Sequence, residues 1–152
     1  MARRRPAARS ETVVTVAAEN VVIAVQVSGD IVTARQAGRE LAAKLGFSLT
    51  DRTMISTAIS EIARNITSYA GSGEIRLLVD DREGRQALVV QAEDQGPGIR
   101  DIARALEDGY STGRGLGLGL PGAKRLMDRL TIESSPGRGT LVEMWKWVPN
   151  GA

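Results

Sequence analysis

The sequence predicts an α+β two-layer sandwich, in which helices cover one face of a mixed, mostly antiparallel sheet. The predicted strands come in hairpin pairs rather than alternating singly with helices, which is typical of this class. The chain has 152 residues, the size of one domain, and 42% of them are hydrophobic. Only 3% are aromatic, so we expect an aliphatic core.

The first half of the chain is expected to form one strand and two helices. Residues 20–27 (NVVIAVQV) are β-branched and apolar, which favours a strand. Residues 31–45 carry apolar side chains at helical spacing, as do residues 51–70. Thr50 or Asp51 is the expected N-cap of the second helix.

The second half of the chain is expected to contain two hairpins separated by helices. The turn residues DREG and SPGRG interrupt runs that are rich in apolar and β-branched residues. Pro121 suits the first turn of a helix that runs to about residue 130. The remaining elements are strands 74–80 and 85–94, a short helix 101–107, and strands 130–134 and 139–148.

The composition excludes several kinds of chemistry. The chain has no Cys, which rules out disulfides, thiolate zinc sites and thiol nucleophiles. It has no His, which removes the commonest general base and transition-metal ligand. Any reaction must therefore use carboxylates, hydroxyls, amides, basic side chains, backbone N–H groups or a hard metal such as Mg²⁺.

Charge is distributed unevenly along the chain. The first ten residues contain Arg3, Arg4, Arg5 and Arg9, and the rest holds 16 basic against 18 acidic residues. We therefore expect a basic, flexible tail over residues 1–12 and a single domain over residues 13–150. No apolar run is long enough to span a membrane, and no apolar segment follows the arginines as in a signal peptide. The expectation is a cytoplasmic protein without membrane or nucleic-acid partners.

One candidate site lies on the second predicted helix. Glu61 and Asn65 are four residues apart, so they lie on one face, one turn from each other. Glutamate can act as a base, and the amide oxygen of asparagine can bind a hard metal. The alternative for this pair alone is an ordinary polar helix edge.

A second candidate lies where the strand 85–94 ends. Asp94 is followed by the turn Gly96–Pro97–Gly98. A carboxylate at a strand end, beside glycines that let a flat ligand approach the backbone, can accept a hydrogen bond from an exocyclic amine. The alternative is a turn with a solvated acid.

A third candidate is the glycine-rich stretch RGLGLGLPGAKR. Alternating glycines allow successive backbone N–H groups to converge on one anion, and a following helix directs its positive end there. The glycines are Gly115, Gly117 and Gly119, and the nearby donors and cations are Ser111, Thr112, Arg114 and Lys124. The alternative is a flexible loop.

Known nucleotide motifs do not account for this stretch. As a P-loop it has Ala123 where the lysine is required. Gly117, Gly119 and Gly122 match a dinucleotide fingerprint, but no strand precedes them and too few residues follow for a doubly wound sheet. A protein-kinase glycine loop is excluded because the chain lacks the catalytic-loop His.

Taken in order, the three segments resemble the GHKL family of ATPases and kinases, which share the Bergerat nucleotide-binding fold. The N box of that family matches EIARN (Glu61–Asn65), and the G1 box matches DQGPG (Asp94–Gly98). The G2 box matches GRGLGLGL (Gly113–Leu120), and Thr140 matches the terminal threonine. Over about residues 20–148 the chain is similar to the small serine kinases of the anti-sigma type, and among these to the RsbT-type switch kinases of stressosomes.

The resemblance implies ATP and Mg²⁺ as ligands and gives each motif a role. Asp94 would bind the adenine amino group, assisted by Gly98 and Thr140, and Asn65 would hold Mg²⁺. Glu61 would be the general base that accepts the proton of a serine or threonine hydroxyl. The full set of expected nucleotide-binding residues is Asn65, Asp94, Gly96, Gly98, Ile99, Thr112, Arg114, Gly115, Leu116, Gly117, Leu118, Gly119, Lys124 and Thr140.

The resemblance also implies partners. RsbT-type kinases phosphorylate STAS-domain scaffold and antagonist proteins and, once released, activate a PP2C-type phosphatase. An alternative is an ATP-binding switch that acts by sequestering a sigma factor or the phosphatase. The presence of Glu61 favours catalysis, because a pure binding protein does not need this base.

Overall fold

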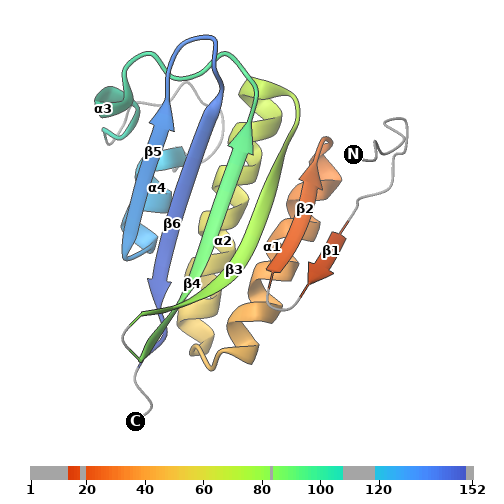
Figure 1. Ribbon diagram of the computed structural model, residues 1–152, viewed down its shortest axis with the longest axis vertical. Helices are drawn as coiled ribbons and strands as arrows, with labels where there is room; N and C mark the ends of the chain where they lie inside the picture. The colour runs from red at the N-terminus through yellow and green to blue at the C-terminus, as the bar shows by residue number, and fades with distance from the viewer. Residues whose placement is uncertain (1–13, 18–19, 83, 108–118, 150–152) are drawn as a thin grey trace.

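The computed structural model describes residues 14–17, 20–82, 84–107 and 119–149. They form one layer of strands and one layer of helices (Figure 1). The elements in chain order are β1 (Val14–Ala17), β2 (Asn20–Val25), α1 (Ser28–Lys44), α2 (Leu49–Asn65), the π-helical turn η1 (Ile66–Ala70), β3 (Gly73–Arg82), β4 (Arg85–Asp94), α3 (Ile102–Ala105), α4 (Gly119–Leu126), β5 (Arg129–Ser134) and β6 (Thr140–Trp147).

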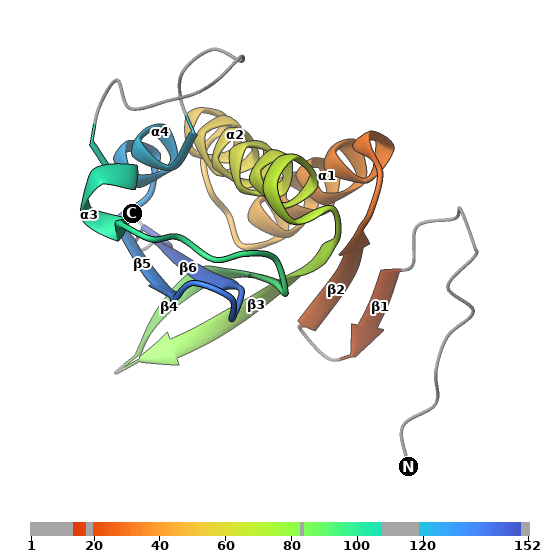
Figure 2. The ribbon, with the colours of Figure 1, turned by 90° about the horizontal axis from the view of Figure 1, so that it is seen from above.

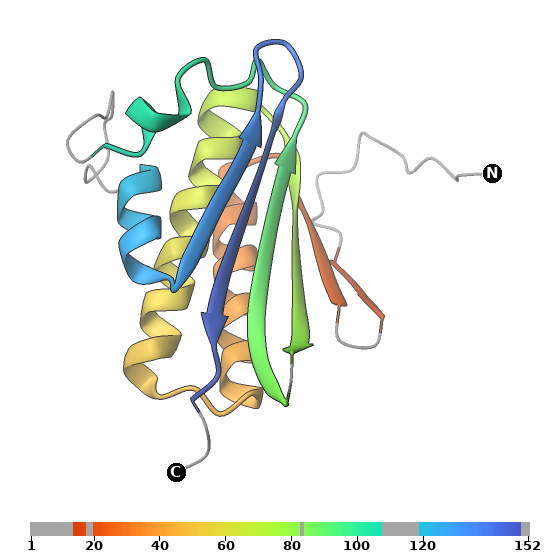
Figure 3. The ribbon, with the colours of Figure 1, turned by 60° about the vertical axis from the view of Figure 1, so that its left-hand side comes forward.

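The strands form one sheet in the order β1-β2-β3-β4-β6-β5. Every neighbouring pair is antiparallel; the predicted sheet was mixed and mostly antiparallel, so the mixed part of that prediction is wrong. Helices α1, α2 and α4 lie together on one face (Figure 2). Figure 3 shows the same layering from the side, with α4 next to α2. The predicted two-layer α+β class is confirmed.

The main core lies between the helices and the sheet and is aliphatic except for Phe47. Gly38 of α1 lies directly against Ile59 of α2. The approach is so close that a side chain at Gly38 would overlap the δ-methyl group of Ile59. This contact lets the two long helices pack closely. Fully buried members of the core include Ile23, Ile55, Ile59, Ile62, Ile75, Leu77, Leu88 and Met144.

The opposite face of the sheet carries a second, smaller cluster, which we call the open-face cluster. It consists of Ala87, Val89 and Trp145, with Leu78 and Trp147 packed against them. The rings of Trp145 and Trp147 lie 5.7 Å apart. Guanidinium groups cover both rings: those of Arg82 and Arg129 lie over Trp145, and that of Arg85 over Trp147.

The element boundaries differ from the predicted ones at several ends. Strand β1 was not predicted. Helix α2 begins earlier than expected, because the hydroxyl of Ser48, and not Thr50 or Asp51, accepts the N-cap hydrogen bond from the Asp51 N–H. The expected helix 51–70 changes to π-helical geometry at Ile66.

Within the described ranges, no helix combines the length and the apolar character needed to cross a membrane.

Candidate functional site

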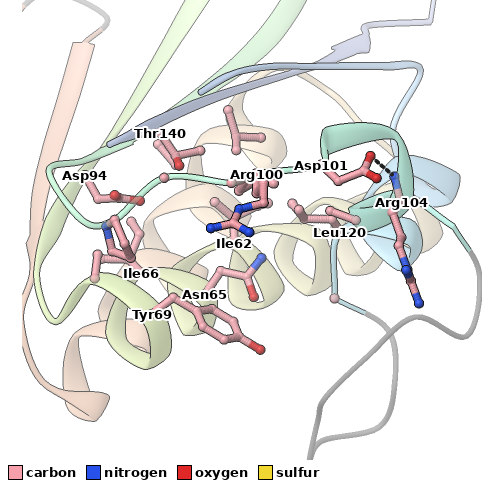
Figure 4. Close-up of a pocket in the computed structure, with 18 residues that line it drawn as sticks. Ile62, Asn65, Ile66, Tyr69, Asp94, Arg100, Asp101, Arg104, Leu120 and Thr140 are labelled. Carbon is pink, nitrogen blue, oxygen red and sulfur yellow. Dashed lines mark hydrogen bonds between the residues drawn. The ribbon is translucent and has the colours of Figure 1, made fainter. Parts of the chain in front are cut away.

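A cavity of about 560 Å³ opens between α2 and one end of the sheet. Its floor comes from α2 and η1, and its walls come from the ends of β4 and β6, the segment 97–101, α3 and the start of α4 (Figure 4). This volume lies within the range of small-molecule sites, about 300–1,000 Å³. The lining residues are Ile62, Asn65, Ile66, Tyr69, Ala70, Ala92, Asp94, Pro97, Gly98, Ile99, Arg100, Asp101, Arg104, Ala105, Gly119, Leu120, Thr140 and Val142.

Asp94 lies at one end of this cavity as the last residue of β4. It pairs across the sheet with Thr140 of β6 and with Gly73 of β3. Its Oδ1 accepts a hydrogen bond of 2.8 Å from the Gly96 N–H, which holds the carboxylate in place. No described residue donates to its second oxygen, which leaves that oxygen available to a ligand amine.

Thr140 presents an acceptor to the same end of the cavity. Ser134 Oγ donates to the carbonyl oxygen of Gly139 at 2.9 Å and accepts from the Ile99 N–H at 2.8 Å. Ser134 has one proton, so the 2.8 Å contact between the two hydroxyls must use the proton of Thr140. The oxygen of Thr140 therefore keeps a lone pair for a ligand or a water.

Two glycines shape the backbone beside Asp94. Gly98 has φ +84°, and a side chain there would collide with the carbonyl oxygen of Ser135. A Cβ on Gly96 would lie 2.6 Å from the Cβ of Ala70, and Gly96 does not line the cavity. Gly96 thus acts through its N–H on Asp94, whereas Gly98 forms part of the wall.

Glu61 and Asn65 lie on α2, one helical turn apart, and Asn65 lies along the cavity between the Asp94 end and the Leu120 end (Figure 4). Glu61 is 8% exposed, and its Oε1 accepts a 3.1 Å hydrogen bond from the Gly119 N–H at the start of α4. Its Oε2 pairs with the Arg64 guanidinium at 3.1 Å. Asn65, one helical turn later, lines the cavity, and so does Gly119. Glu61 does not line it but lies directly behind Gly119.

Not every predicted residue is found among those that line the cavity in the described part of the chain. Thr112, Arg114, Gly115, Leu116, Gly117 and Leu118 lie outside the described residues. Lys124 is exposed on α4 and does not line the cavity. Residues that line it are Asn65, Asp94, Gly98, Ile99, Gly119 and Thr140.

Other residues that line the cavity were not predicted from the sequence. Ile62 and Tyr69 lie three residues before and four residues after Asn65, and Ile66 lies four residues after Ile62, so helical spacing was a usable signal. Arg100 was not recognised because nothing in a turn sequence shows which way its side chains point, and Arg104 was not recognised because the four residues of α3 are too few for a periodic signal.

The arrangement suits a purine nucleotide. An acceptor carboxylate lies at one end of an apolar cavity, and an amide, a backbone N–H and a carboxylate lie toward the other. Among the described residues no cluster of three or more acidic side chains could hold a metal. Mg²⁺ commonly binds through one or two protein oxygens together with substrate phosphates and waters, and Asn65 offers such an oxygen.

The fold and the site define a nucleotide-binding domain, and comparison with known families agrees. Residues 50–150 match the family described as histidine kinase-, DNA gyrase B- and HSP90-like ATPase. The chain belongs to this family.

Individual relatives show which members of the family the chain is similar to. The chain is 53% identical over 119 residues to the serine/threonine-protein kinase RsbT of Bacillus subtilis (strain 168), covering 78% of this chain and 90% of the relative. It is 31% identical over 123 residues to an anti-sigma F factor of Caldanaerobacter subterraneus subsp. tengcongensis, covering 76% and 83%.

A solved structure shares the fold. It is the histidine kinase domain of the Erythrobacter litoralis EL346 blue-light activated histidine kinase, with a TM-score of 0.50 and 18% identity. The match covers 80% of this chain and 60% of that chain.

Proposed function

We propose that this chain is a protein serine/threonine kinase that acts in partner switching and uses ATP with Mg²⁺. The observation that carries the proposal is the placement of Asp94 and Asn65 in one cavity, with Glu61 behind its Gly119 end. The likeness to a serine/threonine-protein kinase at 53% identity supports the activity. Membership of the ATPase family supports the nucleotide.

In this proposal the adenine lies at the Asp94 end. The free oxygen of Asp94 accepts from the exocyclic amine, and the Thr140 oxygen contributes an acceptor, directly or through water. Apolar side chains of α2 and the sheet enclose the base. The phosphates then extend toward Gly119, whose N–H lies at the start of α4. Mg²⁺, held by Asn65, would neutralise phosphate charge.

Glu61 is the proposed base for transfer. The carboxylate takes the proton from a serine or threonine hydroxyl, the hydroxyl oxygen bonds to the γ-phosphorus, and the bond from that phosphorus to the bridging oxygen breaks. The electron pair leaves with ADP. Phosphoryl transfer depends mainly on positioning and charge, so one carboxylate with a metal suffices in a chain that has no His. Before Glu61 can reach a substrate, its hydrogen bond with Gly119 must open.

The proposed substrates are STAS-domain partner proteins of a stressosome, and the proposed second partner is a PP2C-type phosphatase that the released kinase activates. The proposed location is the cytoplasm. The test is incubation of the chain with γ-labelled ATP, Mg²⁺ and purified STAS-domain proteins, followed by mapping of the labelled residue. Label on a serine or threonine of one STAS domain supports the proposal, and its absence from all of them contradicts it.

A second candidate function is sequestration of a sigma factor. It rests on the 31% identity to an anti-sigma F factor over 76% of the chain. Stable, ATP-dependent capture of a sigma factor, with no phosphate transfer to any STAS domain, would favour it over the kinase.

A further inference from the structure

Arg100 is a cation in the cavity to which neither the sequence motifs nor the family match gives a role. It follows the glycine turn at Gly98 and lines the cavity. Its side chain is exposed, and no described residue forms an ion pair or hydrogen bond with its guanidinium. The group is therefore available to a ligand.

The backbone on both sides of Arg100 is held in place. The Ile99 N–H donates to Ser134 Oγ at 2.8 Å, and the Gly137 N–H donates to the Pro97 carbonyl at 2.7 Å. On the other side the Asp101 carboxylate accepts from the Arg104 N–H at 3.1 Å and caps α3. Arg100 thus extends from an anchored backbone segment, so ligand binding has to order its side chain but not the backbone that carries it.

The direction of the side chain indicates which part of a nucleotide it meets. In Figure 4 the Arg100 guanidinium lies over the middle of the cavity, on the side of Asn65, between the Asp94 end and the Leu120 end. A nucleotide whose base lies at Asp94 has its phosphates at this depth or beyond. Guanidinium groups bind phosphate oxygens in a bidentate manner.

We propose that Arg100 binds the α- or β-phosphate of the nucleotide and so makes the site select phosphorylated nucleotides over the nucleoside. The inference rests on the proposed nucleotide binding and adds a residue outside the family motifs. Arg104 also lines the cavity but is engaged within the protein, so Arg100 is the better candidate.

The test compares adenosine, ADP and ATP, the last two with Mg²⁺, by isothermal titration calorimetry. Arg100→Ala should weaken ADP and ATP binding about 10- to 100-fold, because a hydrogen-bonded pair of opposite charges is lost. Adenosine should bind within about twofold of wild type, since the base contacts are unchanged. Arg100→Lys should recover part of the loss.

Arg138→Ala is the matched control, because Arg138 is exposed on the nearby β5–β6 turn and does not line the cavity. It should leave all three affinities unchanged. Unaltered thermal unfolding of ligand-free Arg100→Ala separates a binding effect from a folding effect.

Three results would overturn the inference, and they differ in what else they affect. If the wild type binds ADP but Arg100→Ala binds it equally well, Arg100 has no role and the proposed function stands. If adenosine and ADP lose the same factor, Arg100 stacks on the base instead. If the wild type binds none of the three ligands, the proposed function fails and the inference fails with it.

Discussion

The two faces of the sheet serve different purposes: one contributes to the ligand cavity, and the other carries the open-face cluster. Neighbouring residues of the same strands contribute to each. On β6, Val142 and Met144 face the helices, and the strand begins at Thr140 in the cavity. Glu143, Trp145 and Trp147 alternate with them and form the open face. Successive side chains of a strand point to opposite faces, so a ligand site and a stabilising cluster can share one strand without sharing side chains.

The polar groups of the two faces differ in how many partners they have. In the cavity, Asp94 and Thr140 keep acceptor capacity that no described residue uses. On the open face, Glu143 accepts from Trp145 Nε1 at 2.9 Å and from Gln91 Nε2 at 2.8 Å. Unused acceptors therefore mark the ligand side of the sheet, and substitutions should affect stability on one face and ligand binding on the other.

The largest expected effect concerns Trp145, which is 5% exposed. Trp145→Ala should lower the free energy of unfolding by about 3 kcal/mol or more, because it removes a large buried side chain. ATP affinity should stay within about twofold among molecules that are folded. Urea unfolding followed by calorimetry below the unfolding transition measures both.

Trp147→Ala is the control for that prediction, because Trp147 lies on the same face but is only half-buried. Its cost should be clearly smaller. A large loss of ATP affinity in folded Trp145→Ala would contradict the claim that the open face affects stability and not ligand binding.

Asp94→Asn should give the next largest effect. It should weaken ATP binding and leave stability almost unchanged, the opposite of Trp145→Ala. ATP affinity should fall about 100-fold, since an amide can turn a donor toward the amine that the carboxylate accepts from. Thermal unfolding should change little, because the remaining carbonyl oxygen can still accept from Gly96. Calorimetry with Asp81→Asn, an exposed aspartate at the end of β3, provides the comparison. Equal ATP affinities in the two variants would contradict the proposal that Asp94 binds the adenine.

The free energy of unfolding should depend on pH through Glu143, which lies on the open face of the sheet. The hydrogen bond from Trp145 lowers the pKa of Glu143, as do Gln91 and the positive charges of Arg129 and Arg82, against a raising effect of burial. The folded state then binds fewer protons than the unfolded state. The stabilisation is present above the ordinary glutamate pKa, about 4.3, and is lost as pH falls through the lower folded value.

Glu143→Gln should therefore be less stable than wild type at neutral pH, and the difference should shrink on acidification below about pH 4.3. Urea unfolding at several pH values measures this difference. A difference that is constant with pH, or a shift in ATP affinity at neutral pH, would contradict the assignment.

The smallest expected effect is from the basic tail. Deletion of residues 1–10 should change neither the free energy of unfolding nor the rate of phosphate transfer, if the predicted domain begins at residue 13. Loss of transfer in the truncated chain would show that the tail contributes to the site or to partner binding.

Much of the fold could be predicted from the sequence, because apolar spacing directly records which face is buried. The long helices and the two hairpins follow this rule. Strand β1 has only four residues, too few for a periodic signal. The cap of α2 was misplaced because Ser48, Thr50 and Asp51 are all good N-cap residues, and only the geometry selects among them.

The candidate site could be predicted where residues repeat family motifs, as for Asp94, Asn65 and Thr140, all of which line the cavity. Lys124 carries a suitable charge, but the phase of α4 turns it to solvent. Arg100 has no motif, and its direction depends on a turn fixed by contacts with Ser134 and Ser135, residues more than thirty positions later.

The measurement that tests the central claim most directly is a paired assay of Glu61→Ala. ATP affinity by calorimetry and phosphate transfer from γ-labelled ATP to a STAS-domain partner are measured on the same preparation. We predict an ATP affinity close to that of the wild type and transfer reduced at least about 100-fold, as expected when a general base is removed. Transfer at the wild-type rate would contradict the account, because Glu61 would then not be the catalytic base.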